Sequence, residues 1–313
     1  MSSRSPSPGA GFQYPAQAVS WLKRDVLLFA ASINCTANEP QFLYEFDPSF
    51  AVFPTYPIIL PFKGTESEVI DFYAKQSATP IPGVPKFDPR RVVDGQRSIE
   101  FLKPLPTNST GRKFEVRGTV VGVYDKGKTG TVVETKNELV DAETGEIYTR
   151  AIGSGFFIGQ GGWGGPAGPK SVNFPPPQGK KADVTHTLKL SNEAALLYRL
   201  NGDYNPLHAD PVPGQKMGFG GVIMHGLFTW NSAAHALLQE LGGSDPANIK
   251  QYQARFASPV KPGDELVTEA WRMGSKDNQG FEEIRFITKA NGKVVLSNGK
   301  ALIKVVQKSK SKL

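Results

Sequence analysis

An internal repeat is the feature that most constrains the fold of this chain, because its two halves place the same kinds of segment in the same order. Residues 191–200 have the pattern of a helix that Gly202 ends, and residues 18–32 have a similar pattern in the first half. Each helix is followed by a strand, a proline-containing turn and a long strand, at residues 98–127 and 252–275. Two segments in which apolar and polar residues alternate, as in strands, then complete each half around a tight turn. The 313-residue chain is therefore expected to fold as two copies of one unit.

The second half also contains a long helical segment, residues 225–243, in which apolar side chains recur at helix spacing before a Gly-Gly stop. One helix and several antiparallel strands in each half are typical of the hot-dog arrangement, in which a curved sheet wraps around a central helix. We therefore predict an α+β fold, a double hot dog. In the first half, prolines interrupt the matching segment, residues 51–62, so we expect its central helix to be damaged or absent and to leave a cavity.

Composition predicts the boundaries of the two units. Residues 1–13 are rich in Ser, Pro and Gly and are expected to form a disordered tail. Residues 159–181 are dense in Gly and Pro and are expected to be a linker. These boundaries give an N-terminal hot-dog repeat over residues 14–158, a C-terminal repeat over residues 182–307 and a tail at residues 308–313.

The linker contains the G-x-G-x-x-G spacing of a dinucleotide-binding turn, at Gly159, Gly161 and Gly164. Such a turn opens directly into a helix whose N-terminus holds the pyrophosphate. Here Pro166 and Pro169 follow, and they are not succeeded by helical periodicity. We therefore predict that the chain binds no dinucleotide cofactor.

Charge and hydropathy argue against several classes of function. The net charge is +7, but the basic residues form no stripe interleaved with aromatic residues, so nucleic-acid binding is not expected. No run of about eighteen apolar residues occurs, so no membrane span is expected. Cys35 is the one cysteine and the start of the chain lacks the apolar core of a secretory signal, so we expect an intracellular, reducing location.

The last three residues, Ser311-Lys312-Leu313, match the tripeptide that directs proteins to peroxisomes when it ends the chain. A polar stretch precedes them and would keep them accessible. We therefore expect a location in the peroxisomal matrix, with the import receptor as a partner. Endings of this kind also occur by chance, so coincidence is the alternative.

Polar residues with catalytic potential gather in residues 198–211. Asp203, Asn205 and His208 lie within six positions, after a glycine and around Pro206. The chain must turn sharply there and can bring these side chains together. A carboxylate and an imidazole that converge on one water form a general acid/base pair.

A second chemical feature is the His225-Gly226 pair at the start of the long helical segment. A glycine at a helix N-terminus offers an uncrowded backbone N–H at the positive end of the helix dipole. Such an amide polarises a thioester carbonyl and stabilises charge on its oxygen, as an oxyanion hole does. Each residue also has an ordinary structural explanation, as a turn cap, a satisfied histidine or a helix start, but their combination favours catalysis.

At these residues the sequence resembles the MaoC-like hydratase family, and most closely the type 2 enoyl-CoA hydratase unit of peroxisomal multifunctional β-oxidation enzymes. The resemblance extends from about Val19 to Val306, and its most specific motifs are YRLNGDYNPLHADP and GFGGVIMHGLFTW. It implies two hot-dog repeats, usually paired as a homodimer, that hydrate trans-2-enoyl-CoA to (3R)-3-hydroxyacyl-CoA. The implied substrate is an acyl-CoA, and the implied chemistry needs no metal or redox cofactor.

The resemblance also implies roles for individual residues. Asp203 and His208 match the catalytic pair, and Asn205 matches the residue that holds water or substrate beside them. Gly226 matches the amide of the oxyanion hole. The residues implied in acyl-CoA binding, or in activity more broadly, are Glu45, Asp94, Gly95, Lys126, Tyr204 and Phe256. The family often has His-Gly where this chain has Asp94-Gly95, so only the backbone contact of the glycine is expected to be shared.

The first half is expected to be catalytically silent, because the register of the repeat places Asn34 opposite Asp203 and Glu39 opposite His208. The acid/base pair is therefore absent from the first half. Its proline-broken central segment predicts a tunnel for a long acyl tail, so long-chain as well as short-chain enoyl-CoA should be hydrated.

Two other functions remain open from the residues. A hot-dog thioesterase would share the fold and hydrolyse the CoA ester. A non-catalytic acyl-CoA binding module would keep the Gly226 amide and the basic residues without turnover. The dehydrogenase domain that is fused in multifunctional relatives is not part of this sequence, which favours a stand-alone hydratase.

Overall fold

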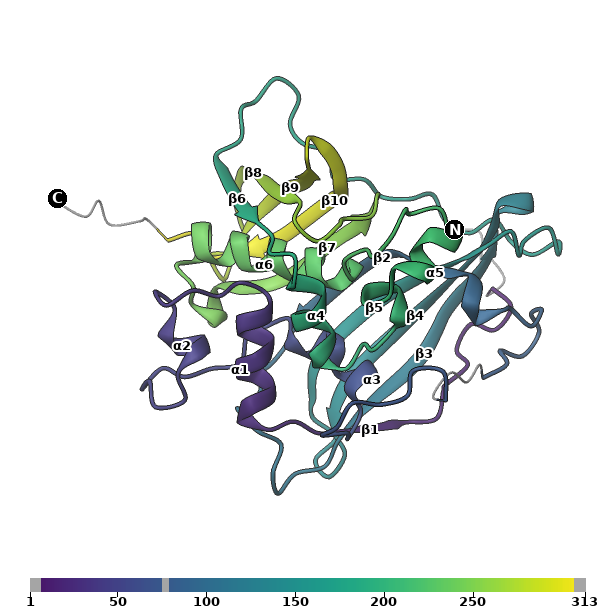
Figure 1. The fold of residues 1–313 in the computed structure, drawn as a ribbon, viewed down its shortest axis with the longest axis horizontal. Coiled ribbons are helices and arrows are strands. Elements are labelled where there is room, and N and C mark those ends of the chain that lie inside the picture. Colours follow the sequence, from purple (N-terminus) through teal and green to yellow (C-terminus); the bar gives the residue numbers. More distant parts are fainter. Residues whose placement is uncertain (1–6, 75–78, 307–313) are drawn as a thin grey trace.

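Ten antiparallel strands form one sheet in the structure, a computed structural model that describes residues 7–74 and 79–306 (Figure 1). The strands of the first half are β1 (Gln17–Val19), β2 (Val92–Phe101), β3 (Phe114–Asp125), β4 (Gly130–Asp141) and β5 (Ile147–Ile158). Those of the second half are β6 (Val184–Lys189), β7 (Ile249–Phe256), β8 (Glu265–Lys276), β9 (Glu282–Ala290) and β10 (Lys293–Ile303). They lie in the order β1-β3-β4-β5-β2-β7-β10-β9-β8-β6.

Both halves arrange their strands in the same way. Numbered along the chain within each half, the strands lie side by side as first, third, fourth, fifth and second. The halves join where β2 pairs with β7, through residues 96–100 and 251–255. The predicted tight turns are present, with a φ of +75° at Gly145 and +82° at Gly292. The internal repeat and the α+β double hot-dog architecture are therefore confirmed.

The helices gather on one side of the sheet (Figure 1). The α-helices are α1 (Lys23–Ser32), α2 (Pro40–Leu43), α3 (Leu60–Lys63), α4 (Ala194–Tyr198), α5 (Pro211–Lys216) and α6 (Gly226–Gly242). The 3₁₀ turns are η1 (Tyr56–Ile59), η2 (Pro89–Arg91), η3 (Gly127–Thr129), η4 (Arg199–Asn201), η5 (Pro206–His208) and η6 (Pro246–Asn248). In the described ranges, every helix is too short or too polar to cross a membrane.

Helix α6 fills the second hot dog, as the sequence predicted. Phe228, Trp230 and Leu238 are each 0% exposed, and most other side chains of the helix are also buried. Burial around nearly the whole circumference suits a helix enclosed by a curved sheet. Each such large apolar side chain stabilises the fold by roughly 1.5–3 kcal/mol. Gly243 ends the helix in the left-handed conformation, with a φ of +64°.

The first half has no counterpart of α6 in the described chain, and only the single turns η1 and α3 occupy its place. Pro57 and Pro61 lie at the start of these two turns, where a missing N–H is tolerated, and they prevent a longer helix. A cavity of about 420 Å³ lies against the strands of the first half. The expected loss of the central helix and the expected cavity are both confirmed.

The tail prediction is wrong for residues 7–13, which lie along the edge of β3. The Gly11 amide donates to the Val120 carbonyl at 2.9 Å, and the Phe12 carbonyl accepts from the Val120 amide at 2.8 Å. The Ser7 hydroxyl accepts from the Val123 amide at 2.9 Å. These bonds satisfy backbone groups of an edge strand, which orders the segment despite its composition. Residues 1–6 and the predicted tail at 308–313 lie outside the described residues.

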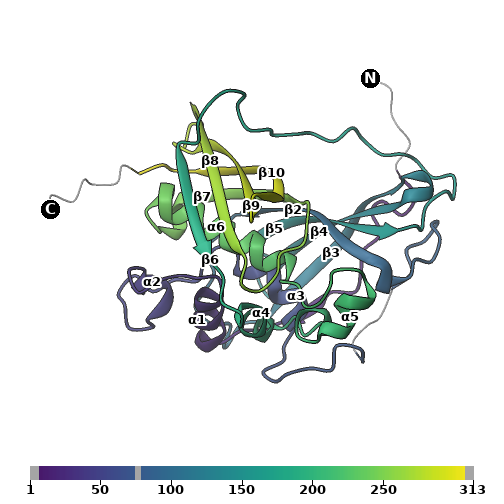
Figure 2. The ribbon, with the colours of Figure 1, turned by 45° about the horizontal axis from the view of Figure 1, so that its top comes forward.

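Residues 159–183 contain no helix or strand and lead from the end of β5 to β6 (Figure 2). Their glycines bind a carboxylate of the chain itself. Asp125 accepts hydrogen bonds from the amides of Gly162, Gly164 and Gly165 at 2.7, 2.8 and 3.3 Å. Of the glycines in the G-x-G-x-x-G spacing, Gly164 is therefore bonded to Asp125, and the Gly159 amide donates to the Thr129 carbonyl at 2.8 Å.

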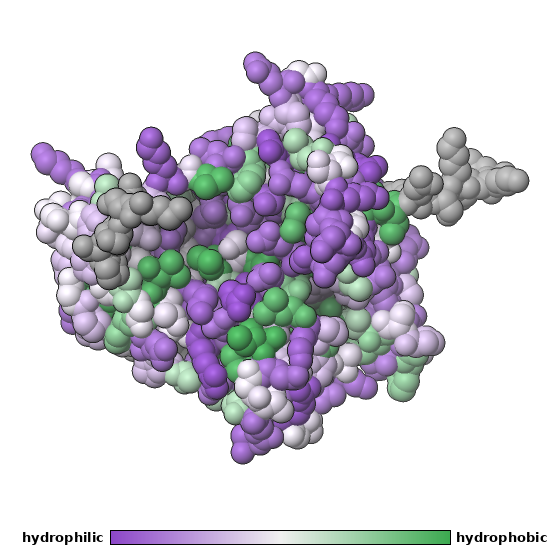
Figure 3. All heavy atoms as spheres, turned by 180° about the vertical axis from the view of Figure 1, so that it is seen from behind, coloured by the Kyte–Doolittle hydropathy of each residue, from purple (hydrophilic) through white to green (hydrophobic). Residues whose placement is uncertain are grey.

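The face of the sheet that turns away from the helices is largely hydrophilic (Figure 3). Charged side chains pair across its strands. Arg150 on β5 pairs with Glu138 on β4 at 2.8 Å and with Glu100 on β2 at 3.2 Å. Because successive residues of a strand point to opposite faces, a slip of one residue would bury these charges, so the pattern helps to fix the register.

A buried carboxylate joins the two halves. Glu39, between α1 and α2, is 2% exposed and accepts a hydrogen bond from Nε2 of His235 on α6 at 2.8 Å. It also accepts from the Ser244 hydroxyl at 2.6 Å and the Thr36 amide at 2.9 Å. Burial alone would raise the pKa of Glu39, but His235 and the other donors lower it to about 2.

Glu39→Gln tests this junction through the pH dependence of stability. The pKa of Glu39 lies below its ordinary value of 4.5, so the ionised group stabilises the fold fully above pH 4.5 and progressively less as the pH falls towards 2. We expect the variant to lose on the order of 3 kcal/mol of unfolding free energy at neutral pH and to show a shallower acid dependence. Urea unfolding monitored by circular dichroism measures both. Glu45→Gln is the matched control, and equal stability of Glu39→Gln and wild type would contradict the assignment.

Candidate active site

The loop after α4 brings the predicted acid and base to the interior. Gly202 has a φ of +116°, and a Cβ there would lie 2.7 Å from Cα of Lys63 in α3. Glycine is required by both the backbone conformation and this close approach. Asn205 then caps η5, since its side-chain oxygen accepts from the Leu207 amide at 3.1 Å. This turn presents His208.

One hydrogen bond fixes the tautomer of His208. Its Nδ1 lies 2.8 Å from the carbonyl oxygen of Ile223. A carbonyl can only accept, so Nδ1 carries the proton and Nε2 keeps its lone pair in the neutral ring. The side chain is 8% exposed. His208 is therefore a buried, oriented imidazole with a free base site at Nε2.

His225 supports this arrangement, and no role was predicted for its side chain. Its ring stacks on that of His208 with centroids 3.7 Å apart. Its Nε2 donates to the backbone carbonyl of Asp203 at 3.0 Å. His225 thus contacts both members of the predicted pair and restrains their positions. The one signal in the sequence was a histidine directly before the glycine of a long helix.

The predicted catalytic groups converge at the N-terminus of α6. A carboxylate oxygen of Asp203 and one ring nitrogen each of His208 and His225 lie within 4.8 Å of one another. Gly226 is exposed between buried neighbours, and it supplies one of the first helical amides, which lack partners within the helix. The ring of Phe256 lies 3.2 Å from the position of a Cβ on Gly226. A carboxylate, an imidazole and a helix-end amide thus share one site.

Burial brings the pKa values of the acid and the base closer together. It raises the pKa of Asp203, and the His208 charge and the Asn205 amide oppose this rise. It lowers the pKa of His208 below the ordinary 6.5, against the attraction of Asp203. The pKa of His225 lies well below 6.5 because of burial and the neighbouring His208. Both imidazoles are therefore neutral at pH 7, and the pair is suited to exchanging a proton with substrate.

Among the residues that the structure describes, two side-chain clusters have donor atoms close enough for a metal ion. One consists of Asp203, His208 and His225, and the other of Cys35, Glu39 and His235. In the first, the Nε2 of His225 donates to a backbone carbonyl. In the second, the Glu39 carboxylate is held by protein donors. The chemistry of the first cluster needs only water and proton transfer, and the absence of a metal stays a prediction.

Three further predicted residues lie at this site. Asp94 on β2 pairs with Arg97 at 2.7 Å. The negative charge of Asp94 raises the pKa of Asp203, and the positive charge of Arg97 lowers it. Gly95 lies at a register shift of β2, where a Cβ would be 3.0 Å from the Ser154 hydroxyl. Gln96 of this strand lies opposite Arg255, whose neighbour Phe256 contacts the Gly226 position, so β2 lies next to the site, and Arg97 is an additional residue there that the sequence did not reveal.

Three predicted residues are not brought to the cluster. Lys126 donates to the Ala167 carbonyl and lies 5.6 Å above the Tyr124 ring. Tyr204 lines a separate hollow of about 190 Å³, with the Arg199 guanidinium 5.0 Å from its ring.

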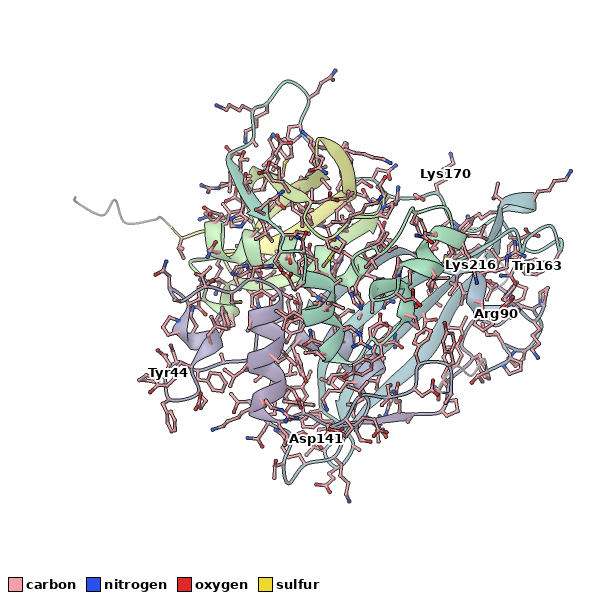
Figure 4. All side chains as sticks on the ribbon, viewed as in Figure 1. Tyr44, Arg90, Asp141, Trp163, Lys170 and Lys216 are labelled. Atoms are coloured by element: carbon pink, nitrogen blue, oxygen red, sulfur yellow. The ribbon has the colours of Figure 1, made fainter. Side chains whose placement is uncertain are left out.

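Glu45 is also remote from the cluster. It follows α2, which is tied to the C-terminal end of α6 by a hydrogen bond from Gln41 to the Ser244 carbonyl. The predicted catalytic groups lie at the other end of this 17-residue helix, which is about 25 Å long. Tyr44, next to Glu45, is 53% exposed at the edge of the molecule (Figure 4).

Two family models match the chain. Residues 20–159 match the MFE-2 hydratase 2 N-terminal domain, and residues 173–294 match the MaoC like domain. Probable dehydratase NIT22 of Ajellomyces capsulatus is 48% identical, covering 94% of this chain and 81% of that protein. Probable enoyl-CoA hydratase 2 of Dictyostelium discoideum is 31% identical, with 91% and 92% covered. Enoyl-CoA hydratase 2, peroxisomal, of Arabidopsis thaliana is 30% identical, with 83% and 84% covered.

Solved structures agree with these matches. A MaoC-like dehydratase from Phytophthora capsici has a TM-score of 0.80 and 32% identity, covering 94% of this chain and 96% of that chain. Full-length peroxisomal multifunctional enzyme type 2 from Drosophila melanogaster has a TM-score of 0.73 and 28% identity, covering 92% of this chain and 48% of that one. The fold and the site define a hydro-lyase of the double hot-dog class. The chain belongs to the MaoC-like family, with an N-terminal domain of the hydratase 2 type.

The ionisation of His208 can be measured without turnover. We expect the imidazole of His208 to titrate below pH 6.5 in the wild type, because burial disfavours its charged form. In Asp203→Asn the attractive carboxylate is lost, so the pKa should fall further. Two-dimensional NMR of the ring nitrogens follows both titrations, with His186 as the internal control. A pKa at or above 6.5, or one that rises in the variant, would contradict this electrostatic description.

Proposed function

We propose that this protein adds water to trans-2-enoyl-CoA to give (3R)-3-hydroxyacyl-CoA, and also catalyses the reverse dehydration. The observation that carries the proposal is the convergence of Asp203 and His208 with His225, the residue directly before Gly226 at the N-terminus of α6. Two relatives named as enoyl-CoA hydratase 2, each of similar length to this chain, support the substrate class. The R configuration is carried by the same family resemblance.

The proposed reaction uses one water held by the acid/base pair. The Gly226 amide binds the thioester oxygen and stabilises the negative charge that develops as the water oxygen attacks C3, an effect of about 3 kcal/mol for one donor. Nε2 of His208 and the carboxyl of Asp203 remove a proton from the water and return one to C2, so that the pair ends in its starting state. Asn205 shapes the turn that positions His208, and its amide nitrogen is assigned to the water or substrate beside them.

The first half is assigned to acyl binding and not to catalysis. Asn34 and Glu39 stand in place of the acid/base pair, and Glu39 is bound by His235. The cavity that replaces the first central helix is bordered by Asp94 and Arg97, whose charges also act on Asp203. An acyl chain extending from the catalytic groups would therefore enter this cavity.

We assign the enzyme to peroxisomal fatty-acid β-oxidation and to a homodimer. The names of the Arabidopsis and Drosophila relatives include a peroxisomal location. The sequence Ser311-Lys312-Leu313, which lies outside the described residues, supports the same location. No metal, redox cofactor or nucleic acid is required for the proposed reaction, and CoA takes part only as a portion of the substrate.

A product analysis tests the proposed function. Crotonyl-CoA and decenoyl-CoA are expected to lose their enoyl absorbance and to give the R 3-hydroxy product on chiral chromatography. A thiol reagent is expected to detect no release of CoA. Release of CoA without hydration would instead identify a hot-dog thioesterase. Binding without turnover would identify an acyl-CoA binding module, and the S product would contradict the assignment to this hydratase class.

Substitution of the acid and the base tests their roles separately from the fold. We expect Asp203→Asn and His208→Gln each to lower kcat by a factor of about 100 or more, because each removes a proton-transfer group. Circular dichroism should show unchanged secondary structure. Asp210→Asn in the same loop and His186→Gln on β6 are the matched controls and should retain wild-type rates. Near-wild-type kcat in either active-site variant would remove that residue from the mechanism.

A further inference from the structure

We infer that the preferred acyl chain carries a hydroxyl or carbonyl oxygen several carbons beyond the reacting double bond. The inference rests on the proposed function and adds the chemical class of the acyl group. It comes from the lining of the 420 Å³ cavity in the first half. This cavity lies against β1 to β5, where the first half lacks a long central helix.

Comparison of the two halves shows that the fold itself does not require a polar lining. β9 has the same place in the second half that β4 has in the first. β9 contributes Ile284 and Phe286 to the core, both 0% exposed. β4 instead presents Thr135 and Asn137 to the cavity. Polar side chains therefore occupy positions where the repeat otherwise places large apolar ones.

Two polar groups enclosed between β8 and β9 of the second half satisfy each other. Thr268 on β8 and Thr288 on β9 lie opposite each other, and their hydroxyls are 2.9 Å apart. In the first half, Asn137 faces a volume large enough for an acyl chain, and beside it the Thr135 hydroxyl pairs with the side chain of Tyr14. A ligand in that volume meets a hydroxyl, and an amide that can both donate and accept.

Glycines on neighbouring strands make room for the polar groups. Gly153 lies between Arg97 and Thr135 in one row across β2, β5 and β4. A Cβ at Gly153 would lie 3.3 Å from Nη1 of Arg97. A Cβ at Gly118 would lie 3.1 Å from Oδ1 of Asn137. Gly153 thus leaves room for the guanidinium, whereas the space above Gly118 is shared by the amide and the Tyr14 ring, whose Cδ2 also lies 3.1 Å from that Cβ position.

The chemistry of this lining favours an oxygenated chain over a plain hydrocarbon. A saturated tail laid over Asn137 and Arg97 would remove water from them without replacing its hydrogen bonds, which is unfavourable. A hydroxyl or carbonyl on the chain supplies the missing partner. One such hydrogen bond corresponds to a preference of about tenfold. The apolar neighbours Val133, Val116 and Phe157 accommodate the methylenes around it.

The register of the sheet indicates where the oxygen belongs along the chain. Arg97 lies near the N-terminus of α6, because its neighbour Gln96 is opposite Arg255 on β7 and the ring of the next residue, Phe256, lies 3.2 Å from a Cβ position on Gly226. Thr135 is two strands beyond Arg97, a separation of about 10 Å across the sheet. An extended chain of about eight carbon atoms covers this distance. A ten-carbon enoyl chain with a terminal hydroxyl is therefore a suitable probe, whereas crotonyl-CoA is too short to reach these residues.

The test compares kcat/KM for crotonyl-CoA, decenoyl-CoA and ω-hydroxydecenoyl-CoA. The wild type should prefer the hydroxylated ten-carbon substrate to the plain one by about tenfold. In the double variant Thr135→Val with Asn137→Leu, the preference should be lost or reversed, and crotonyl-CoA should be hydrated at the wild-type rate. Lys136→Gln, on the opposite face of β4, is the matched control and should keep the wild-type preference.

Each outcome separates this inference from the proposed function. Equal rates for the two ten-carbon substrates, or a preference for the plain one, would overturn the inference while leaving the hydratase assignment intact. A preference that survives in the double variant would remove its assignment to this cavity. If the double variant loses crotonyl-CoA activity, the wild-type comparison decides alone. A wild type that hydrates none of the three contradicts the proposed function, and calorimetric binding of the two ten-carbon esters then decides the inference.

Discussion

The structure depends on holding a carboxylate and an imidazole together where water is scarce. Burial works against the charged form of both Asp203 and His208, and each is supported by the other. Such a pair persists only if its surroundings fix its position. Gly202 supplies the sharp turn, the Ile223 carbonyl orients His208, and the stacked ring of His225 holds the Asp203 backbone. The N-terminus of α6 completes the site with an amide at its positive end.

The two halves of the chain share a topology but differ in what their central regions contain. The second half keeps its long central helix, and the apolar contacts of α6 stabilise the fold while its first turn adjoins the proposed catalytic residues. In the first half, prolines prevent such a helix, and a cavity lies in its place. Stability is then maintained across the junction, by continuous pairing of β2 with β7 and by the buried contact of Glu39 with His235. A duplicated fold can open a binding cavity in one half because the other half retains a complete core.

Much of this organisation could be predicted because it is encoded locally. The helical periodicity of apolar residues predicted α6, the prolines predicted the broken helix, and the turn glycines predicted the hairpins. The short spacing of Asp203 and His208 along the chain made their convergence predictable. The positions of side chains that depend on long-range packing could not be predicted. Tyr204 adjoins Asp203 in sequence but points into another hollow, and Lys126 turns to the Ala167 carbonyl. The stacking of His225 and the approach of Arg97 arise only when distant elements meet. Residues 7–13 are ordered by the free edge of β3, which composition does not reveal.

A crystal structure with (3R)-3-hydroxydecanoyl-CoA bound tests the central claim most directly. The account predicts that the 3-hydroxyl oxygen lies within hydrogen-bond distance, about 3 Å, of both the Asp203 carboxyl and Nε2 of His208. It also predicts that the thioester oxygen accepts a hydrogen bond from the Gly226 amide. A ligand whose C3 hydroxyl lies away from either side chain, or whose thioester is bound elsewhere on the surface, would contradict the account.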